Sequence, residues 1–128
     1  MPPVNLFAYG TLRHPAVITY VLGREPEREE VEVEGFVRYR IRNADYPGIL
    51  PQRGSRIDGT LFRDITPEEW ERLDEYESDL YLRQTVNVLH PEGGTSIAFA
   101  YVLPPEHESI CTEEPWDLNH YHPRHLPE

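Results

Sequence analysis

The chain has 128 residues, of which 23 are acidic and 12 are basic, so its formal net charge at pH 7 is −11. A charge of that sign repels phosphate backbones and anionic lipid head groups, and we therefore expect neither a nucleic acid nor a membrane as a partner. All twelve basic residues are arginines, which excludes Schiff-base chemistry and any other reaction that needs a lysine nucleophile.

The length and the cysteine content predict one cytoplasmic domain. A chain of this size can bury about two-thirds of the surface that its unfolded form exposes, so we expect residues 1–128 to share a single core. We expect neither export nor a membrane span, because no charged leader with an apolar run behind it and no long apolar stretch is present. The single cysteine, Cys111, cannot form an internal disulfide, which agrees with a reducing compartment and a passive thiol.

The first segment predicts a strand, a glycine turn and a helix. Residues 5–9 are apolar and partly aromatic and end at Gly10, which is typical of a buried strand that runs into a tight turn. Pro15 suits the first turn of a helix, apolar residues follow it at helical spacing, and Gly23 is a suitable C-terminal stop.

The next segment predicts β-structure with a charged stripe. After a charged connector, residues 24–30, the apolar residues between 31 and 41 alternate as they do in strands. The alternation places three arginines on one face of this ladder, Arg38, Arg40 and Arg42. Such a stripe either faces water or lines a site for an anionic substrate, and the pattern leaves both readings open.

Beyond this ladder the sequence predicts another strand and then its best-marked helix. Residues 45–48 form a turn pattern that leads into a short apolar return, and residues 57–62 again have the character of a strand. Thr66 is a suitable N-cap, Pro67 suits the first helical position, and Glu69 completes a capping box with Thr66.

The last part of the chain predicts two strands and a tail. Residues 84–89 and 96–102 have the pattern of strands on either side of the turn at 92–94. The tail, residues 104–128, holds five prolines and four histidines, so we expect it to be loop-rich, with at most a short helix near Trp116.

One carboxylate on the predicted helix is aimed towards its apolar face. Neighbouring residues of an α-helix are about 100° apart around the axis, so Glu77 is offset from Trp70 by only roughly 20°. Asp74 falls near the edge of the buried face, and Glu75 falls on the side that meets water. Glu77 is therefore a candidate buried acid if the helix continues that far. If the helix frays earlier, the side chain lies at the surface, and the pattern alone allows either outcome.

The turn Tyr9-Gly10-Thr11-Leu12 is a candidate anion site. A glycine turn between a strand and a helix directs several unpaired backbone N–H groups at one place, which suits a carboxylate or a developing oxyanion. Gly10 would let a ligand approach the backbone, and the Thr11 hydroxyl could donate or accept a hydrogen bond. Such a turn also needs a glycine for its geometry alone, so a purely structural role fits as well.

No metal or cofactor is expected. His120, His122 and His125 could supply metal ligands, but a tail rich in histidine and proline is more often solvated. The sequence contains no GxSxG, GxGxxG or P-loop pattern, so serine-triad hydrolysis and nucleotide binding have no local support. The residues by themselves predict a small site that combines a buried acid with an anion-binding turn.

Four motifs resemble those of the γ-glutamylcyclotransferase-like (AIG2-like) family. Tyr9–Leu12 is similar to its YGSL or YGTL opening, and residues 46–50 (YPGIL) are similar to its Tyr-Pro-Gly turn. Residues 58–62 (DGTLF) are similar to its G-x-L-[YF] strand, and residues 73–83 are similar to its LDxxEG and YxR motifs. The resemblance covers residues 4–102 and keeps the family's order of motifs.

This resemblance implies an α+β fold, a compact mixed β-barrel flanked by short helices, with Glu77 as the catalytic residue. The residues that it implies for substrate binding are Tyr9, Gly10, Thr11, Leu12 and Tyr81. Two positions depart from the family pattern, because Ser78 replaces the usual glycine after the glutamate and Thr11 replaces serine of many members. Neither change removes a group that the chemistry needs.

The implied function is that of a cyclotransferase that needs no cofactor. The leaving amine, the oligomeric state, and the alternatives of a non-catalytic small-molecule-binding module or an interaction module are left open. In the enzyme reading a small γ-glutamyl amide is the partner, and its own α-amine attacks the γ-carbonyl to release 5-oxoproline. Glu77 would be general base and then general acid, and burial would raise the pKa of its carboxyl towards neutrality, which suits both roles.

Overall fold

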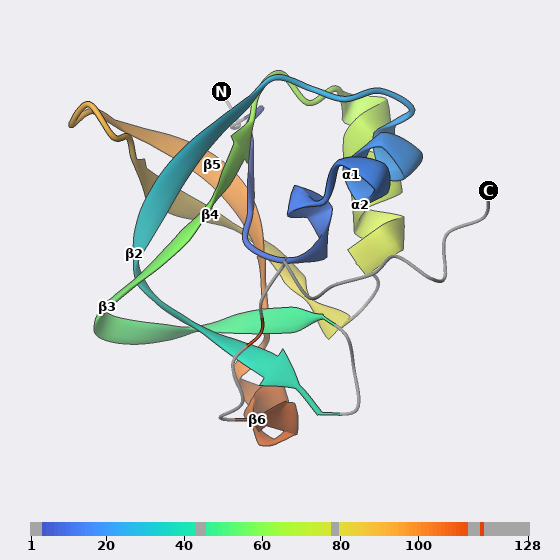
Figure 1. The fold of residues 1–128 in the computed structure, drawn as a ribbon. Coiled ribbons are helices and arrows are strands. Elements are labelled where there is room, and N and C mark those ends of the chain that lie inside the picture. Colours follow the sequence, from blue (N-terminus) through green and yellow to red (C-terminus); the bar gives the residue numbers. More distant parts are fainter. Residues whose placement is uncertain (1–3, 43–45, 78–79, 113–115, 117–128) are drawn as a thin grey trace.

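The computed structural model describes residues 4–42, 46–77, 80–112 and 116, and five strands in it close into a barrel (Figure 1). The strands are β1 (Leu6–Ala8), β2 (Arg28–Ile41), β3 (Pro47–Phe62), β4 (Leu82–Leu89) and β5 (Thr95–Val102). They are hydrogen-bonded in the order β3-β1-β5-β4-β2, and the pairing of β2 with β3 closes the ring. Because β1 is antiparallel to β3 but parallel to β5, the barrel is mixed, as predicted.

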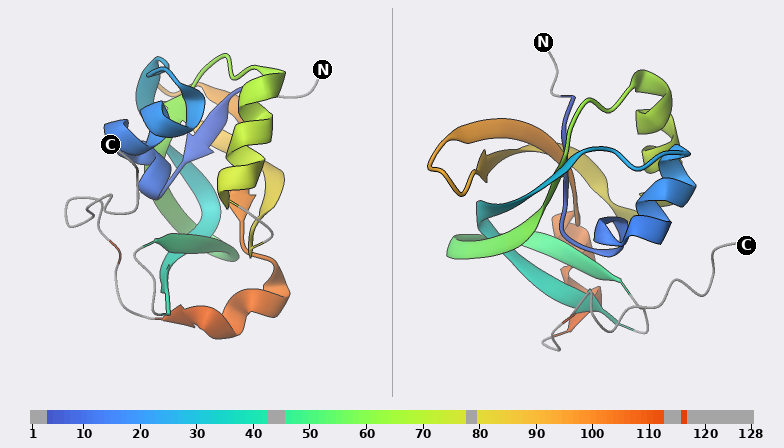
Figure 2. Two further views of the ribbon diagram at one scale, coloured as in Figure 1. Left: turned by 90° about the vertical axis from the view of Figure 1, so that its right-hand side faces the viewer. Right: turned by 45° about the horizontal axis from the view of Figure 1, so that its top comes forward.

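Two helices lie against one side of this barrel, α1 (Pro15–Leu22) and α2 (Pro67–Glu77), and they contact each other (Figure 2). The α1 helix ends at Gly23, whose φ of 79° is the left-handed conformation that glycine adopts readily. These elements confirm the α+β fold class, a barrel with short flanking helices. Among the described residues, no helix has the length and apolar character needed to cross a bilayer.

The predicted capping box at the start of α2 is present. The Thr66 N–H donates to Glu69 Oε1 at 2.9 Å, and the Glu69 N–H donates to Thr66 Oγ1 at 3.2 Å. The Glu69 carboxylate also accepts from Arg24 Nε at 2.6 Å and from Arg24 Nη2 at 2.8 Å. One carboxylate therefore caps α2 and ties it to the segment that follows α1.

The β2 and β3 strands are longer and more continuous than the sequence predicts. The connector predicted for residues 24–30 already belongs to β2 from Arg28 onwards, and β3 runs unbroken from Pro47 to Phe62. The pairing register shifts between Glu34 and Phe36, and Gly35 between them has a φ of 89°. This β-bulge lets the ribbon bend sharply without ending, which the pattern of short strands does not show.

The apolar core has two parts. One part lies inside the barrel and draws on all five strands, with Phe7, Tyr9, Val33, Ile57, Leu61, Val88 and Ala100 among its members. The other part lies between the barrel and the helices and includes Leu6, Ala8, Ile18, Phe62, Leu73 and Leu103. The β1 strand has both faces buried because its successive side chains alternate between these two parts, which explains its unbroken apolar run.

The described start of the tail is ordered. A 3-10 helix, Pro105–Ile110, leads into the short strand β6 (Cys111–Thr112), which pairs with the end of β2. Trp116 itself is described, but the residues on either side of it, where a short helix is predicted, lie outside the described ranges, as do His120, His122 and His125.

Candidate active site

Glu77 is the last residue of α2, so the helix continues as far as the buried-acid prediction requires. The residue is half-buried as a whole, but its carboxyl group is shielded from water, and this burial raises its pKa from 4.5 to about 8. Glu75, two residues earlier, is exposed, as its position on the helix predicts. The structure therefore shields the Glu77 carboxyl from water, and this carboxyl is protonated at neutral pH and able to ionise slightly above it.

Three phenols from three different strands or connections lie close enough to this carboxyl for its charge to affect them. Burial raises the pKa of Tyr9, Tyr81 and Tyr101, and the nearby charge of an ionised Glu77 raises each of them further. The Tyr9 hydroxyl donates to the Tyr101 carbonyl oxygen at 2.5 Å, and the Tyr81 hydroxyl donates to the Pro47 carbonyl oxygen at 2.7 Å. The predicted site residues Tyr9 and Tyr81 thus lie near Glu77, with hydroxyls that remain neutral and fixed.

The turn that follows β1 meets the end of α2. It continues as a 3-10 helix, Thr11–Arg13, in which the Arg13 N–H donates to the Gly10 carbonyl at 3.0 Å. The Thr11 hydroxyl lies 3.0 Å from the hydroxyl of Tyr76, the neighbour of Glu77. The structure therefore brings the two constellations of the sequence, the turn and the acid, to one place.

Leu12 and Gly10 have packing roles in this turn. The Leu12 side chain is buried in the core between barrel and helices, so only its backbone is able to meet a ligand. A Cβ atom on Gly10 would lie 2.8 Å from Pro47 Cγ and 2.9 Å from Pro47 Cδ. The space beside the glycine is therefore filled by the ring of the Tyr-Pro-Gly turn, and this close approach accounts for the glycine without a ligand.

Arg83, the arginine of the Tyr-x-Arg motif, holds α2 against the barrel. The Arg83 guanidinium lies 4.9 Å from the ring centroid of Trp70 and 5.0 Å from that of Phe99, and it pairs with Asp74 Oδ1 at 3.2 Å. The same Asp74 oxygen accepts from the Tyr101 hydroxyl at 2.7 Å. These contacts hold the last turns of α2 against β4 and β5, one turn before Glu77.

Sequence reasoning did not single out Tyr76 or Tyr101. Tyr76 directly precedes the candidate acid in the motif, and this position could have marked it as a site residue. Tyr101 follows the alternation of its strand, and nothing local distinguishes it from a core tyrosine. Its part in the site depends on the pairing of strands that are far apart in the sequence.

The arginine stripe of β2 divides into different environments. Arg38 is largely buried and pairs with Asp58 Oδ1 at 3.3 Å, whereas Arg42 is exposed and donates to the Ser109 carbonyl at 3.1 Å. Phe36 packs on the core inside the barrel, and Arg38 shares its face of the strand because alternate residues point to the same side. Of the two interpretations of the arginine stripe, the one in which it faces water is therefore wrong at Arg38.

One group of potential metal ligands occurs among the described residues, and it does not include Glu77. The ligand atoms of Glu29, His90 and Glu92 lie within 4.8 Å of one another. His90 Nδ1 is 2.8 Å from Glu29 Oε2, and Arg63 pairs with the other Glu29 oxygen at 2.7 Å. Hydrogen bonds and ion pairs already engage Glu29 and His90, which is sufficient to explain why these two residues lie together.

Comparison with known proteins agrees with this architecture. A family model described as gamma-glutamyl cyclotransferase, AIG2-like, matches residues 6–118. AIG2-like protein C of Arabidopsis thaliana is 38% identical over 85 residues, which are 66% of this chain and 49% of that protein. A protein of Methanocaldococcus jannaschii that is named as a gamma-glutamylcyclotransferase is 31% identical over 101 residues, 77% of this chain and 45% of that protein. The chain thus spans about half the length of these relatives.

A solved structure shares the fold. The solution structure of an Arabidopsis thaliana protein superposes with a TM-score of 0.75 at 27% sequence identity and covers 93% of this chain and 80% of that one. A match over 93% of this chain shows that its fold belongs to a recurring architecture.

Proposed function

This chain belongs to the AIG2-like γ-glutamylcyclotransferase family, and we propose that it releases 5-oxoproline from a γ-glutamyl amide. The observation that carries the proposal is the carboxyl of Glu77, which has a pKa of about 8 and lies beside three neutral phenols and the turn after β1. A buried acid that titrates near neutral pH is suited to accept a proton and return it within one reaction cycle.

The reaction needs one bond to form and one to break. The α-amine nitrogen of the substrate attacks the γ-carbonyl carbon and closes the five-membered ring. Ionised Glu77 accepts the proton that this nitrogen loses. Protonated Glu77 then donates the proton to the departing amide nitrogen, the bond from that nitrogen to the carbonyl carbon breaks, and a free amine leaves. Because nucleophile and electrophile belong to one molecule, the main task of the protein is to hold the substrate folded.

The groups around Glu77 are suited to holding the substrate folded while its own amine attacks the carbonyl. In a 3-10 helix the first N–H groups have no acceptor within the helix, so those of Thr11 and Leu12 are suited to an oxyanion or to the substrate's α-carboxylate. The hydroxyls of Tyr9 and Tyr81 are tied to backbone carbonyls and give the site rigid walls. Rigid walls favour the folded substrate over its extended forms.

A non-catalytic binding module is the alternative on the same fold. A carboxylate that only binds the ammonium group of a ligand works best when it is ionised, which means a pKa at or below the ordinary value. Burial instead raises the pKa of Glu77 to about 8, so this carboxyl is mostly neutral at pH 7. That property favours proton transfer over static binding.

The test is a panel of γ-glutamyl compounds assayed for 5-oxoproline, with variants of α2 as controls. The panel includes γ-glutamyl amino acids, a γ-glutamyl peptide such as glutathione, γ-glutamyl alkylamines and the isopeptide to the ε-amine of lysine. We expect turnover of at least one compound by the wild type and by Glu75→Gln, and a loss of about 10²-fold to 10⁴-fold in Glu77→Gln. Binding without 5-oxoproline would establish the module, and a Glu77→Gln protein with a tenth of wild-type turnover would remove Glu77 from its role.

A further inference from the structure

The 3-10 helix that carries the candidate anion site depends on its neighbours for its orientation. It has three residues, Thr11–Arg13, and its backbone bonds run from the Arg13 N–H to the Gly10 carbonyl and from the His14 N–H to the Thr11 carbonyl, each at 3.0 Å. A single helical turn is unstable by itself, because one or two hydrogen bonds do not offset the conformational entropy that its formation costs. The direction of its N–H groups is therefore set by contacts with other elements.

Each residue of this turn is tied to a different part of the protein. The Thr11 hydroxyl lies 3.0 Å from the Tyr76 hydroxyl on α2, and the Leu12 side chain is buried in the core between barrel and helices. Arg13 is tied instead to the ribbon formed by β2 and β3. The turn is thus held between the helix that carries Glu77 and the wall of the barrel.

The Arg13 guanidinium binds three side chains of this ribbon, one with each nitrogen. Nε donates to Thr60 Oγ1 at 3.2 Å, Nη1 to Asp58 Oδ2 at 3.2 Å, and Nη2 to Glu30 Oε1 at 2.8 Å. Arg28 of β2 adds a bond to the Arg13 main chain, from Nη2 to the carbonyl oxygen at 2.7 Å. The ribbon therefore fixes both the backbone and the side chain of Arg13.

The acceptors around Arg13 are themselves held in place. Thr60 is buried, lies opposite Glu30 in the pairing of the two strands, and donates from its hydroxyl to Glu30 Oε2 at 2.8 Å. Asp58 is also bound by Arg38, which pairs with its Oδ1 at 3.3 Å. The Arg13 side chain is only 15% exposed. A shielded guanidinium with fixed acceptors at all three nitrogens has one preferred geometry, because its donors form a rigid planar fork.

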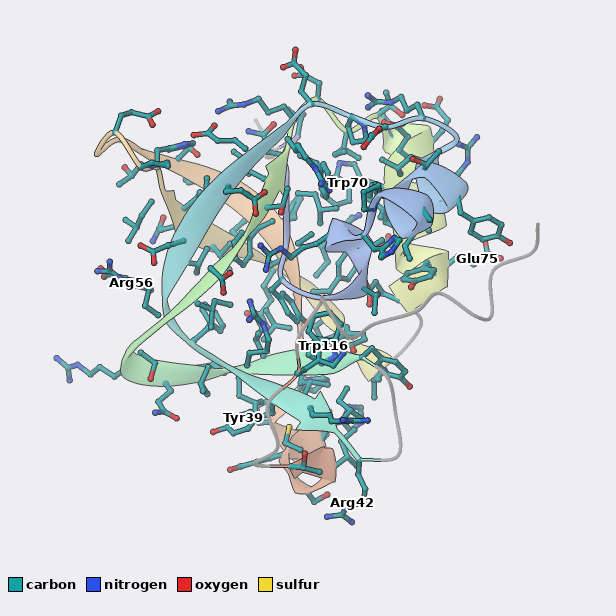
Figure 3. All side chains as sticks on the ribbon, viewed as in Figure 1. Tyr39, Arg42, Arg56, Trp70, Glu75 and Trp116 are labelled. Carbon is teal, nitrogen blue, oxygen red and sulfur yellow. The ribbon has the colours of Figure 1, made fainter. Side chains whose placement is uncertain are left out.

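Arg56 of the same ribbon has a similar set of charges but no such link. It bonds Glu32 at 3.2 Å and Glu34 at 2.7 Å, and its side chain is 53% exposed. Figure 3 shows Arg56 at the outer edge of the barrel, away from the helices. Arg56 therefore joins β3 to β2 alone, whereas Arg13 joins both strands to the turn.

We propose that Arg13 is a positioning residue that aims the N–H groups of Thr11 and Leu12 at the substrate. This inference rests on the proposed function, since it concerns the part of the candidate site that the turn supplies. Without the fork the turn samples further orientations, and the apparent affinity for a ligand falls with the fraction of molecules that keep the competent one. Lysine retains the charge of Arg13 but cannot form the fork, so Arg13→Lys separates geometry from charge.

The experiment measures binding of 5-oxoproline, the expected product, by an NMR titration of the isotope-labelled protein. The backbone amide signals of Thr11 and Leu12 report contact with the ligand, and the concentration dependence of their shifts gives the dissociation constant. Because the titration observes folded molecules, a loss of stability alone does not change this constant. Arg13→Lys is compared with Arg56→Lys, which makes the same change on the same ribbon.

A second pair of variants keeps the test decisive if Arg13→Lys does not fold. Glu30→Gln and Glu32→Gln each neutralise an exposed glutamate of β2, but only Glu30 bonds Arg13. We expect Glu30→Gln to raise the dissociation constant about twofold to threefold, because one bond of the fork loses its charged acceptor. Glu32→Gln should leave the constant unchanged, and equal constants for the two glutamate variants would count against a role for Arg13.

In the wild type we expect 5-oxoproline to shift the amide signals of Thr11 and Leu12. Arg13→Lys should raise the dissociation constant about tenfold, and Arg56→Lys should leave it unchanged. Wild-type affinity in the Arg13→Lys protein, equal losses in both arginine variants, or a titration that leaves the signals of Thr11 and Leu12 in place would overturn the inference. A wild type that binds 5-oxoproline at the turn but releases none from any γ-glutamyl compound would contradict the proposed function alone.

Discussion

The hydroxyl oxygens of Thr11 and Tyr76 lie 3.0 Å apart, so the turn after β1 is joined directly to the last turn of α2. Tyr76 precedes Glu77, and this bond therefore fixes the acid relative to the backbone N–H groups of the turn. Thr11→Val keeps the shape of the side chain and removes the bond, and we expect kcat/KM to fall about twofold to tenfold. Thr11→Ser keeps the hydroxyl and should retain wild-type kinetics. Equal activities of the Val and Ser variants would show that the bond has no part in positioning.

The pH dependence of kcat/KM should follow the ionisation of Glu77. A general base acts in its ionised form, and burial raises the pKa of this carboxyl to about 8. We therefore expect kcat/KM to rise close to tenfold per pH unit below about pH 8 and to level off above it. Glu75→Gln, which alters an exposed carboxylate of the same helix, should leave the inflection in place. A rate that is flat from about pH 6 to about pH 9 would contradict the assignment.

The same carboxyl should make the folded protein less stable at alkaline pH. The unfolded chain loses the Glu77 proton near pH 4.5, whereas the folded protein keeps it up to about pH 8. The native state therefore binds more protons between these values, and the stability present below pH 4.5 is lost as the pH rises towards 8. Glu77→Gln removes this loss, so its stability should exceed that of the wild type at high pH by up to about 5 kcal/mol.

Urea unfolding at two pH values measures this difference. At about pH 4.5 the wild type and Glu77→Gln should have similar unfolding free energies, and at about pH 8.5 the variant should be the more stable protein. Glu75→Gln corrects for the change in net charge, because its carboxylate is exposed in both states. A difference that does not change with pH would mean that Glu77 titrates normally in the folded protein.

Gly10→Ala should destabilise the fold through a steric clash. The added Cβ would lie within 2.9 Å of two ring atoms of Pro47, closer than carbon atoms normally approach. We expect a loss of about 1–3 kcal/mol in unfolding free energy. Gly94→Ala is the matched control, because nothing lies within 4 Å of a Cβ at that position. If both variants unfold at the same urea concentration, the contact between the two turns tolerates the methyl group.

Chelation should leave turnover unchanged, because intramolecular amide attack assisted by one carboxyl has no step that calls for a metal. The competing hypothesis places a catalytic metal on His120, His122 and His125. Under that hypothesis a chelator, or truncation before His120, abolishes the reaction and added zinc restores the chelated enzyme. A reversible loss of activity on chelation would therefore overturn the mechanism proposed for Glu77.

Local signals were sufficient to predict several elements. The capping box of Thr66 and Glu69 and the stop at Gly23 depend on neighbouring residues alone, and the structure contains both. The helical position of Glu77 relative to Trp70 follows from the same local geometry. The β3 strand shows the limit, because Pro51 and Gly54 suggest a break, yet the strand runs from Pro47 to Phe62 and pairs with β2 on both sides of residues 52–55.

The remainder of the site depends on contacts that no local pattern contains. The alternation of side chains correctly placed Arg38 on the opposite face of the strand from Tyr39 and Ile41. Which of the two faces points into the barrel depends on the bulge at Gly35, where the pairing register shifts. The phenols near Glu77 come from the turn after β1, from β5 and from the segment after α2, and only the closed barrel places them together. Arg38 therefore could be recognised as unusual only in three dimensions.

The position of β1 has a consequence for the order of folding. It is the first strand in the chain, but it lies between β3 and β5, and Leu6 pairs in parallel with Phe99. The β2–β3 and β4–β5 hairpins join neighbours in the sequence, so they can form early, whereas β1 must wait for both. Because Tyr9 directly follows β1, we expect a chain that has emerged from the ribosome only as far as β4 to contain its first hairpin but no assembled site.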